Sequence, residues 1–324
     1  MSGLWKLYQT KNTPYLDIKP SFSGRTVIVT GSNTGVGFEA AIKFVALDAK
    51  RVVLGVRSVA KGEDARSRIE ERTGRQDVVE VWQLDMLDYD SIQAFARRAD
   101  TQLESLDVAV LNAGVMFASA EQSAYGWEKT LQVNVISTAL LGLLLLPKLK
   151  MSRMSGSARP VLELVGSNLH TRITGLDDPL DGRLLKHYSA CFSRSQYSIS
   201  KLFMEYINIG LADRAKSEVT GKPDVLVLSV SPGLCRSDLG RAYNTWYSWP
   251  AMWAFQTLFQ RSAEEGARMY VSGTLVGVEG QGGFWHEGRL KEPAPLVAGE
   301  EGKVLQRRVW KEVMDALEGY VSGH

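Results

Sequence analysis

Cysteine is scarce in this chain of 324 residues, in which only Cys191 and Cys235 occur. Two cysteines cannot build a disulfide framework, and no spacing typical of a metal site is found. We therefore expect both to be reduced thiols in a cytoplasmic protein, and we expect no bound metal.

The chain also lacks an excess of charge and a long apolar run. Its 38 Lys and Arg residues nearly balance its 36 Asp and Glu residues. This balance does not favour nucleic acid or an anionic membrane as the main partner. The longest apolar run, residues 139–147, is far shorter than the roughly 20 residues of a membrane span. A buried helix is expected there, and the N-terminus has no apolar stretch typical of a signal peptide.

Short apolar strands alternate with helices from residue 25 to about residue 285, and 44% of the residues are apolar. Strands with few polar alternations are typical of a parallel sheet that is buried on both faces. The pattern predicts an α/β fold with a doubly wound, Rossmann-like parallel sheet. We expect a polar, irregular N-terminal extension (1–24) and a single dinucleotide-binding domain (25–324) that ends in a C-terminal tail.

A glycine-rich turn, TGSNTGVG, lies between the first strand and the first helix. Glycines let the backbone approach phosphates, and a helix N-terminus offers free N–H groups. The turn predicts a dinucleotide site, although its G-x-x-x-G-x-G spacing also fits an ordinary turn. The expected cofactor contacts are Gly31, Asn33, Thr34, Gly35, Val36 and Gly37.

The second strand ends in GVRS, without the carboxylate that usually binds the ribose hydroxyls of NAD. Arg57 stands there instead, and its guanidinium suits a 2′-phosphate. Lys61, one turn later, is a second candidate. We expect NADP(H) as the cofactor; the alternative is a solvated arginine at the start of a helix.

Tyr197 and Lys201 are four residues apart, on one face of a predicted helix. A nearby cation favours the phenolate and lowers the pKa of a tyrosine, so Tyr197 could exchange a proton with a carbonyl or alcohol. Ser167 ends the fifth strand, where its hydroxyl could polarise a carbonyl beside Tyr197. Asn134 lies within a helix, where asparagine is unfavourable, and could hold a water.

Small and turn-forming residues stand at two other strand ends, where a cofactor could lie close. They are Asn112, Ala113 and Gly114 after the fourth strand, and Pro232 and Gly233 after the sixth strand, followed by Ser237.

Across about residues 22 to 320 the chain resembles the short-chain dehydrogenase/reductase family. The matching motifs are TGSNTGVG, LNAG, LQVNV, VGS, YSISK and SPG with the later serine. The stretches VVLGVRSVAKGE and SAEEGA and the tail around Trp310 are similar to the retinol-dehydrogenase-like branch and to fungal biosynthetic-pathway reductases. The resemblance thus implies an oxidoreductase, with secondary metabolite biosynthesis as its setting.

The same resemblance implies a catalytic tetrad of Asn134, Ser167, Tyr197 and Lys201. It implies that Lys201 and Tyr197 also contact the cofactor, that Lys201 holds the nicotinamide ribose, and that protons are relayed through a water at Asn134. It further implies that Asp85 contacts the adenine, and that Gly233 and Ser237 help to seat the nicotinamide.

Two segments are expected to shape the substrate pocket. The insert between Ser167 and Tyr197 is longer than in shorter members of the family and should border the pocket. Residues 238–262 are rich in aromatics and predict a substrate lid, with Tyr243, Trp246, Trp249 and Trp253 as pocket residues. A helix pair packed on the core, or docked on a membrane surface, is the alternative.

Together these features predict an NADP(H)-dependent oxidoreductase that reduces a ketone or aldehyde on a bulky lipophilic substrate. Two alternatives remain: an isomerase or cyclase that uses the cofactor as a scaffold, and an NADP(H)-binding sensor. Formation of a homodimer through the helices of Asn134 and Tyr197 is left open.

Overall fold

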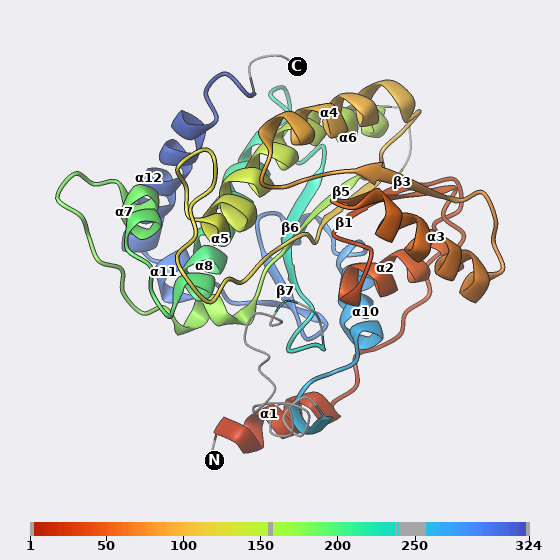
Figure 1. Cartoon of the computed structure of the whole chain (residues 1–324), viewed down its shortest axis with the longest axis horizontal. Coiled ribbons are helices and arrows are strands. Elements are labelled where there is room, and N and C mark those ends of the chain that lie inside the picture. The colour runs from red at the N-terminus through yellow and green to blue at the C-terminus, as the bar shows by residue number, and fades with distance from the viewer. Residues whose placement is uncertain (1–2, 155–157, 237–238, 240–256, 322–324) are drawn as a thin grey trace.

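A computed structural model of the chain describes residues 3–154, 158–236, 239 and 257–321 (Figure 1). Its centre is an eight-stranded sheet in the order β3-β2-β1-β4-β5-β6-β7-β8. All neighbours are parallel except β7 and β8, which are antiparallel. The strands are β1 (Thr26–Thr30), β2 (Arg51–Val56), β3 (Val79–Gln83), β4 (Val108–Leu111), β5 (Val161–Val165), β6 (Leu226–Ser231), β7 (Phe284–His286) and β8 (Arg289–Lys291).

Helices cover both faces of this sheet. Helices α4, α6 and α8 bury apolar side chains on one face, and α2, α3 and α10 do so on the other. The described helices are α1 (Gly3–Asn12), α2 (Gly35–Ala46), α3 (Val59–Thr73), α4 (Tyr89–Gln102), α5 (Lys129–Leu131), α6 (Thr138–Met154), α7 (Leu184–Ala190), α8 (Gln196–Arg214), α10 (Ala263–Gly273), α11 (Pro295–Ala298) and α12 (Glu300–Ala316). The doubly wound parallel sheet that the sequence predicts is therefore present.

The core strands are short and apolar because both of their faces are covered. Every residue of β1, β5 and β6 is buried. The helical stretch Lys129–Arg153 is long and apolar enough to span a membrane, but 94% of its apolar window is buried inside the fold. The apolar run at residues 139–147 thus belongs to a core helix, as expected.

Strand order reverses between β1 and β4, and this reversal positions the candidate site. Strand β1 pairs with β2 on one side and with β4 on the other. The loops that follow β1 and β4 therefore diverge at the carboxyl edge of the sheet. In open α/β sheets ligands bind at such a topological switch point.

Three segments differ from the sequence-based expectation. The N-terminal extension is not irregular throughout, because residues 3–12 form α1. The polar sequence of the insert after Ser167 is typical of a loop, but the insert contains a 3₁₀ helix (Asn168–Arg172) and α7. Strand β8 adds an antiparallel edge that was not expected.

Candidate active site

The glycine-rich turn after β1 has the shape of a phosphate cradle. Gly31 has φ of 63°, a left-handed conformation, and its N–H donates to Gly55 O over 2.8 Å. A Cβ at Gly31 would lie 2.9 Å from Ala113 Cα, so only glycine fits between the two loops. Thr34 precedes α2 without capping it through its side chain. The first amides of α2, which begins at Gly35, are left for a ligand, and this fits a dinucleotide pyrophosphate.

Asn112 ties the loop after β4 to the glycine-rich turn. Its Nδ2 donates to Thr30 O over 2.8 Å, and its Oδ1 accepts from the Tyr270 hydroxyl over 2.9 Å. The Ala113 N–H donates to Thr30 Oγ1 over 2.9 Å. Gly37 also packs against the Asn112 side chain. Because its side-chain polar atoms are hydrogen-bonded within the protein, Asn112 holds the glycine-rich turn in place rather than offering these atoms to a ligand.

Arg57 and Lys61 are exposed after the end of β2, the place where a family member would bind the adenosine ribose of its cofactor. The Ser58 side chain caps α3 and accepts from the Lys61 N–H. Within the described part of the chain, neither the Arg57 nor the Lys61 side chain forms an ion pair. Asp85, after β3, is half-buried, and its Oδ1 accepts from the Leu87 N–H over 2.9 Å. Two cations and no carboxylate at the β2 end fit a 2′-phosphate.

Ser167, Tyr197 and Lys201 are brought together at the carboxyl edge, although 30 residues separate the first two in the chain. Ser167 follows β5, and its hydroxyl is hydrogen-bonded to the Tyr197 hydroxyl. Lys201 lies one turn further along α8, with its Nζ 5.6 Å from the centre of the Tyr197 ring. That Nζ also donates to Val165 O over 2.7 Å. Strand β5 and helix α8 thus hold the three groups in one cluster.

Burial dominates the protonation of this cluster. It raises the pKa of Tyr197 above its ordinary value of 10.0, and the hydrogen bond from Ser167 only partly offsets this. Burial also lowers the pKa of Lys201 to about 7, while the negative charge of Glu205 opposes that shift. The sequence predicts that a nearby cation lowers the pKa of Tyr197; in the structure burial raises it, and the effect that lowers it is the hydrogen bond of Ser167 rather than the charge of Lys201. Tyr197 is therefore a phenol at neutral pH.

Asn134 occupies a π-helical segment, Gln132–Ser137, that joins α5 to α6. Its Nδ2 donates to Val115 O over 2.9 Å and to Ser200 Oγ over 3.0 Å, and its Oδ1 accepts from the Val115 N–H over 2.9 Å. Single π-helical turns within α-helices frequently occur at functional sites. Here the wide turn accommodates an asparagine that a regular helix disfavours, and connects it through Ser200 to the helix of Tyr197.

The loop after β6 completes the edge. Pro232 and Gly233 are half-buried there, and Gly233 adopts φ of 79° beneath the buried Tyr15 hydroxyl. Ser237 lies outside the described residues. So do Tyr243, Trp246, Trp249 and Trp253, the aromatics that the sequence places in the lid.

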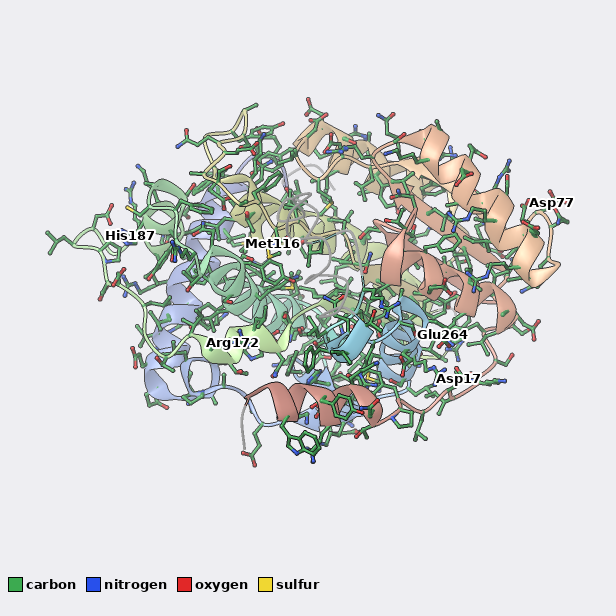
Figure 2. All side chains as sticks on the ribbon, turned by 60° about the horizontal axis from the view of Figure 1, so that its bottom comes forward. Asp17, Asp77, Met116, Arg172, His187 and Glu264 are labelled. Atoms are coloured by element: carbon green, nitrogen blue, oxygen red, sulfur yellow. The ribbon has the colours of Figure 1, made fainter. Side chains whose placement is uncertain are left out.

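The insert forms one wall of an open pocket of about 350 Å³. Residues from both ends of the insert and from the start of α8 line it, among them Ile173, Asp177, His187, Cys191, Ser195 and Ile199. Figure 2 labels His187, which belongs to α7 of the insert, at the left of the molecule. No cluster of His, Cys, Asp or Glu residues suited to a metal occurs within the described ranges.

Comparisons with known proteins match this architecture. A family model described as short chain dehydrogenase matches residues 25–158. The short-chain dehydrogenase/reductase ffsI of Aspergillus flavipes is 38% identical over 322 residues, which cover 98% of this chain and 92% of the relative.

Solved structures share the fold. A protein from Mycobacterium paratuberculosis superposes with a TM-score of 0.67 at 22% identity, over 94% of this chain and 98% of that one. A short chain dehydrogenase from Shigella flexneri, solved in complex with NADP, gives 0.54 at 24% identity, over 76% and 89% of the two chains. The chain belongs to the short-chain dehydrogenase/reductase family, oxidoreductases that use NAD(P)(H) and act on small molecules.

Proposed function

We propose that the protein is an NADP(H)-dependent reductase that converts a ketone or aldehyde on a bulky lipophilic molecule to the alcohol. The observation that carries the proposal is the cluster of Ser167, Tyr197 and Lys201 at the same sheet edge as the glycine-rich turn. The cofactor supplies the hydride, and the protein supplies position and a proton.

Tyr197 is the proposed acid. Because burial keeps its hydroxyl protonated, it can give that proton to the carbonyl oxygen as negative charge develops there. The Ser167 hydroxyl, already hydrogen-bonded to Tyr197, polarises the same oxygen. A phenol that starts protonated favours reduction over oxidation, since oxidation must begin with its deprotonation.

Lys201 and Asn134 are proposed to support Tyr197. A protonated Lys201 stabilises the phenolate that remains after proton transfer, and it would also hold the nicotinamide ribose. Asn134, through Ser200, keeps the helix of Tyr197 in register and would hold the water that returns a proton to Lys201.

NADP(H) is proposed over NAD(H) because of Arg57. A guanidinium pairs well with a phosphate and poorly with a ribose hydroxyl. Gly31, Asn33, Thr34, Gly35, Val36 and Gly37 would hold the pyrophosphate, with Ala113 and Gly114 behind it. Asp85 would contact the adenine, while Pro232, Gly233 and Ser237 would seat the nicotinamide. The Shigella flexneri protein of the same fold was solved with NADP.

The substrate is proposed to extend from Tyr197 into the insert pocket, under a lid formed by residues 238–262. The pocket lining contains Ser195 and Ile199, on either side of Tyr197 in the chain, but not Tyr197 itself. The pocket volume of about 350 Å³ falls within the usual range for small-molecule sites. The aromatics of the lid sequence would exclude water and favour a lipophilic substrate. From the motifs shared with fungal biosynthetic-pathway reductases we propose a cytoplasmic role in secondary metabolism; a similar protein comes from the fungus Aspergillus flavipes.

A carbonyl screen tests the proposal. Polyketide-like, steroid and retinoid ketones and aldehydes are incubated with the protein and NADPH, and absorbance at the nicotinamide band is followed together with the alcohol formed. We expect one alcohol for each NADPH oxidised. Product without NADPH consumption would favour an isomerase or cyclase instead, and cofactor binding with no product across the panel would favour a sensor.

A further inference from the structure

A buried carboxylate lies behind the proposed proton donor. Glu205 is one helical turn after Lys201 on α8 and is 3% exposed. The hydroxyl of Ser229, on β6, donates to its Oε1 over 2.7 Å. The Nδ1 of His170, in the insert, lies 3.9 Å from the same oxygen. Burying an ionised carboxylate is costly unless a charge or several hydrogen bonds compensate it.

The backbone before Ser167 is shaped around this carboxylate. A Cβ at Gly166 would lie 2.8 Å from Glu205 Oε1 and would also collide with Ser229 Oγ. Glycine is therefore the residue that lets Glu205 reach the end of β5. The Glu205 carboxylate thus lies against the residue that precedes Ser167, and on α8 it follows Lys201 by one helical turn.

Within the described residues, Glu205 is the negative charge that favours protonated Lys201. It is 4% exposed, and its Nζ donates to a neutral acceptor, Val165 O. Burial lowers the pKa of Lys201 to about 7 and raises the pKa of Glu205 to about 7. The attraction between the two side chains opposes both shifts. Glu205 is the charge that favours the protonated form of Lys201, whereas the ionised form of Glu205 is favoured first by the hydrogen bond from Ser229 and then by Lys201.

His170 does not compete for this role. Its ring is 2% exposed, and burial lowers its pKa below the ordinary value of 6.5. Its Nδ1 also lies 2.8 Å from Ser167 O. At neutral pH the ring is therefore neutral, and Lys201 is the cation that faces Glu205 within the described ranges.

We propose that Glu205 is a positioning residue that keeps Lys201 protonated, and that Ser229 and His170 hold its carboxylate in place. The effect of Glu205 on catalysis rests on the proposed function, since it assumes that protonated Lys201 stabilises the phenolate of Tyr197. The charge balance itself is a property of the ligand-free protein and is measurable without any substrate.

The direct test is the titration of Lys201 in the ligand-free protein. Lysine carrying ¹³C at the ε carbon is incorporated, and the Lys201 signal is assigned by its loss in Lys201→Arg. Glu205→Gln keeps the shape and the acceptor for Ser229 but removes the charge. We expect its Lys201 midpoint to fall by about one pH unit. Glu163→Gln, the matched control at a buried glutamate on β5, should leave the midpoint unchanged.

Carbonyl reduction provides the second readout. In Glu205→Gln the loss of activity at high pH should begin about one pH unit lower than in the wild type, which corresponds to about tenfold less activity above both midpoints. Ser229→Ala removes a hydrogen bond that favours ionised Glu205, so it should raise the pKa of Glu205 and shift the pH dependence of carbonyl reduction in the same direction. This variant replaces Glu205→Gln in the test if Glu205→Gln does not fold.

An unchanged Lys201 midpoint in Glu205→Gln, or in Ser229→Ala if only that variant folds, would overturn the inference. A wild-type protein that shows the expected midpoints but reduces no carbonyl would instead count against the proposed function alone.

Discussion

Burial sets the chemistry of individual residues in this site. Tyr197, although its side chain keeps some exposure, stays a phenol because burial of its surroundings raises its pKa, and the nearly fully buried Lys201 has its pKa lowered to about 7 by burial. The sequence predicts which residues gather at the sheet edge, because the carboxyl ends of parallel strands meet there. It does not predict their protonation, because that depends on tertiary burial and on Glu205, which looks in the sequence like any helical glutamate.

The proposed preference for NADPH depends on Arg57. Wild-type protein should bind NADPH about tenfold to a thousandfold more tightly than NADH, since charge-assisted hydrogen bonds to phosphate contribute that much. Arg57→Ala should remove most of the preference, as measured by nicotinamide fluorescence titration. Arg68→Ala, at an exposed arginine on α3, is the control and should keep it. Equal affinities of the wild type for the two cofactors would contradict the assignment.

Glu163 carries a prediction about stability. It lies within β5, fully buried, and both of its carboxyl oxygens lack a hydrogen-bond partner within the described ranges. Burial raises its pKa well above 4.5. Below pH 4.5 the folded and unfolded states are both protonated. As the pH rises further, only the unfolded state loses the proton, so stability falls by up to about 1.4 kcal/mol per pH unit until the folded pKa is reached.

Glu163→Gln removes this titration. The free energy of unfolding of the variant should exceed that of the wild type by a small amount at pH 4 and by an increasing amount as the pH rises to 8. Urea unfolding at several pH values measures it. A stability difference that does not change with pH would mean that Glu163 finds a partner or water in solution.

At the scale of elements, the core strands and helices could be predicted, and the exceptions have physical causes. Apolar runs identify β1, β4, β5 and β6 because both faces of these strands are buried. The π-helical turn at Gln132–Ser137 has the same apolar pattern as the helix around it. The one sign of it in the sequence is Asn134, a residue type that is unfavourable inside a regular helix. Helix α7 and strand β8 are short and draw their stability from tertiary contacts.

The insert and the lid should control which substrates are accepted. Cys191→Trp adds bulk to the pocket lining and should raise KM for a bulky ketone about tenfold, while sparing a small aldehyde. Trp246→Ala should raise the same KM by opening the lid. Steady-state kinetics with both substrates measure the effect. Leu180→Trp, at a fully exposed position of the same insert, is the control. Equal losses for the two substrates would indicate misfolding rather than a pocket.

At the scale of the whole molecule, the N-terminal segment is fastened to the fold rather than free on its surface. The buried guanidinium of Arg261 donates to the carbonyl oxygens of Thr10 and Thr13 and lies over the Tyr15 ring, 3.8 Å from its centre. Lys43 bridges Asp17 and Glu264 at 2.8 and 2.6 Å, and Figure 2 shows these two acids near each other. The sequence could not reveal this, because polar residues far apart in the chain supply the contacts.

Arg261→Met tests this attachment. It keeps the apolar stem but loses hydrogen bonds from a buried cation, so the free energy of unfolding should fall by about 1.5 to 3 kcal/mol. Urea unfolding measures the change. Arg236→Met, at an exposed position in the preceding loop, should have little effect. Equal stability of the two variants would show that the N-terminal segment is held by other contacts.

The central claim is that Tyr197 donates the proton in an NADPH-dependent reduction. Tyr197→Phe keeps the ring and removes only the hydroxyl, so its effect isolates proton transfer. The decisive measurement compares kcat for a carbonyl reduced by the wild type with kcat of this variant, alongside NADPH affinity. If Tyr197 is the proton donor, kcat falls by at least about 10²-fold while NADPH binding changes little. A variant that retains most of the wild-type turnover would contradict this claim.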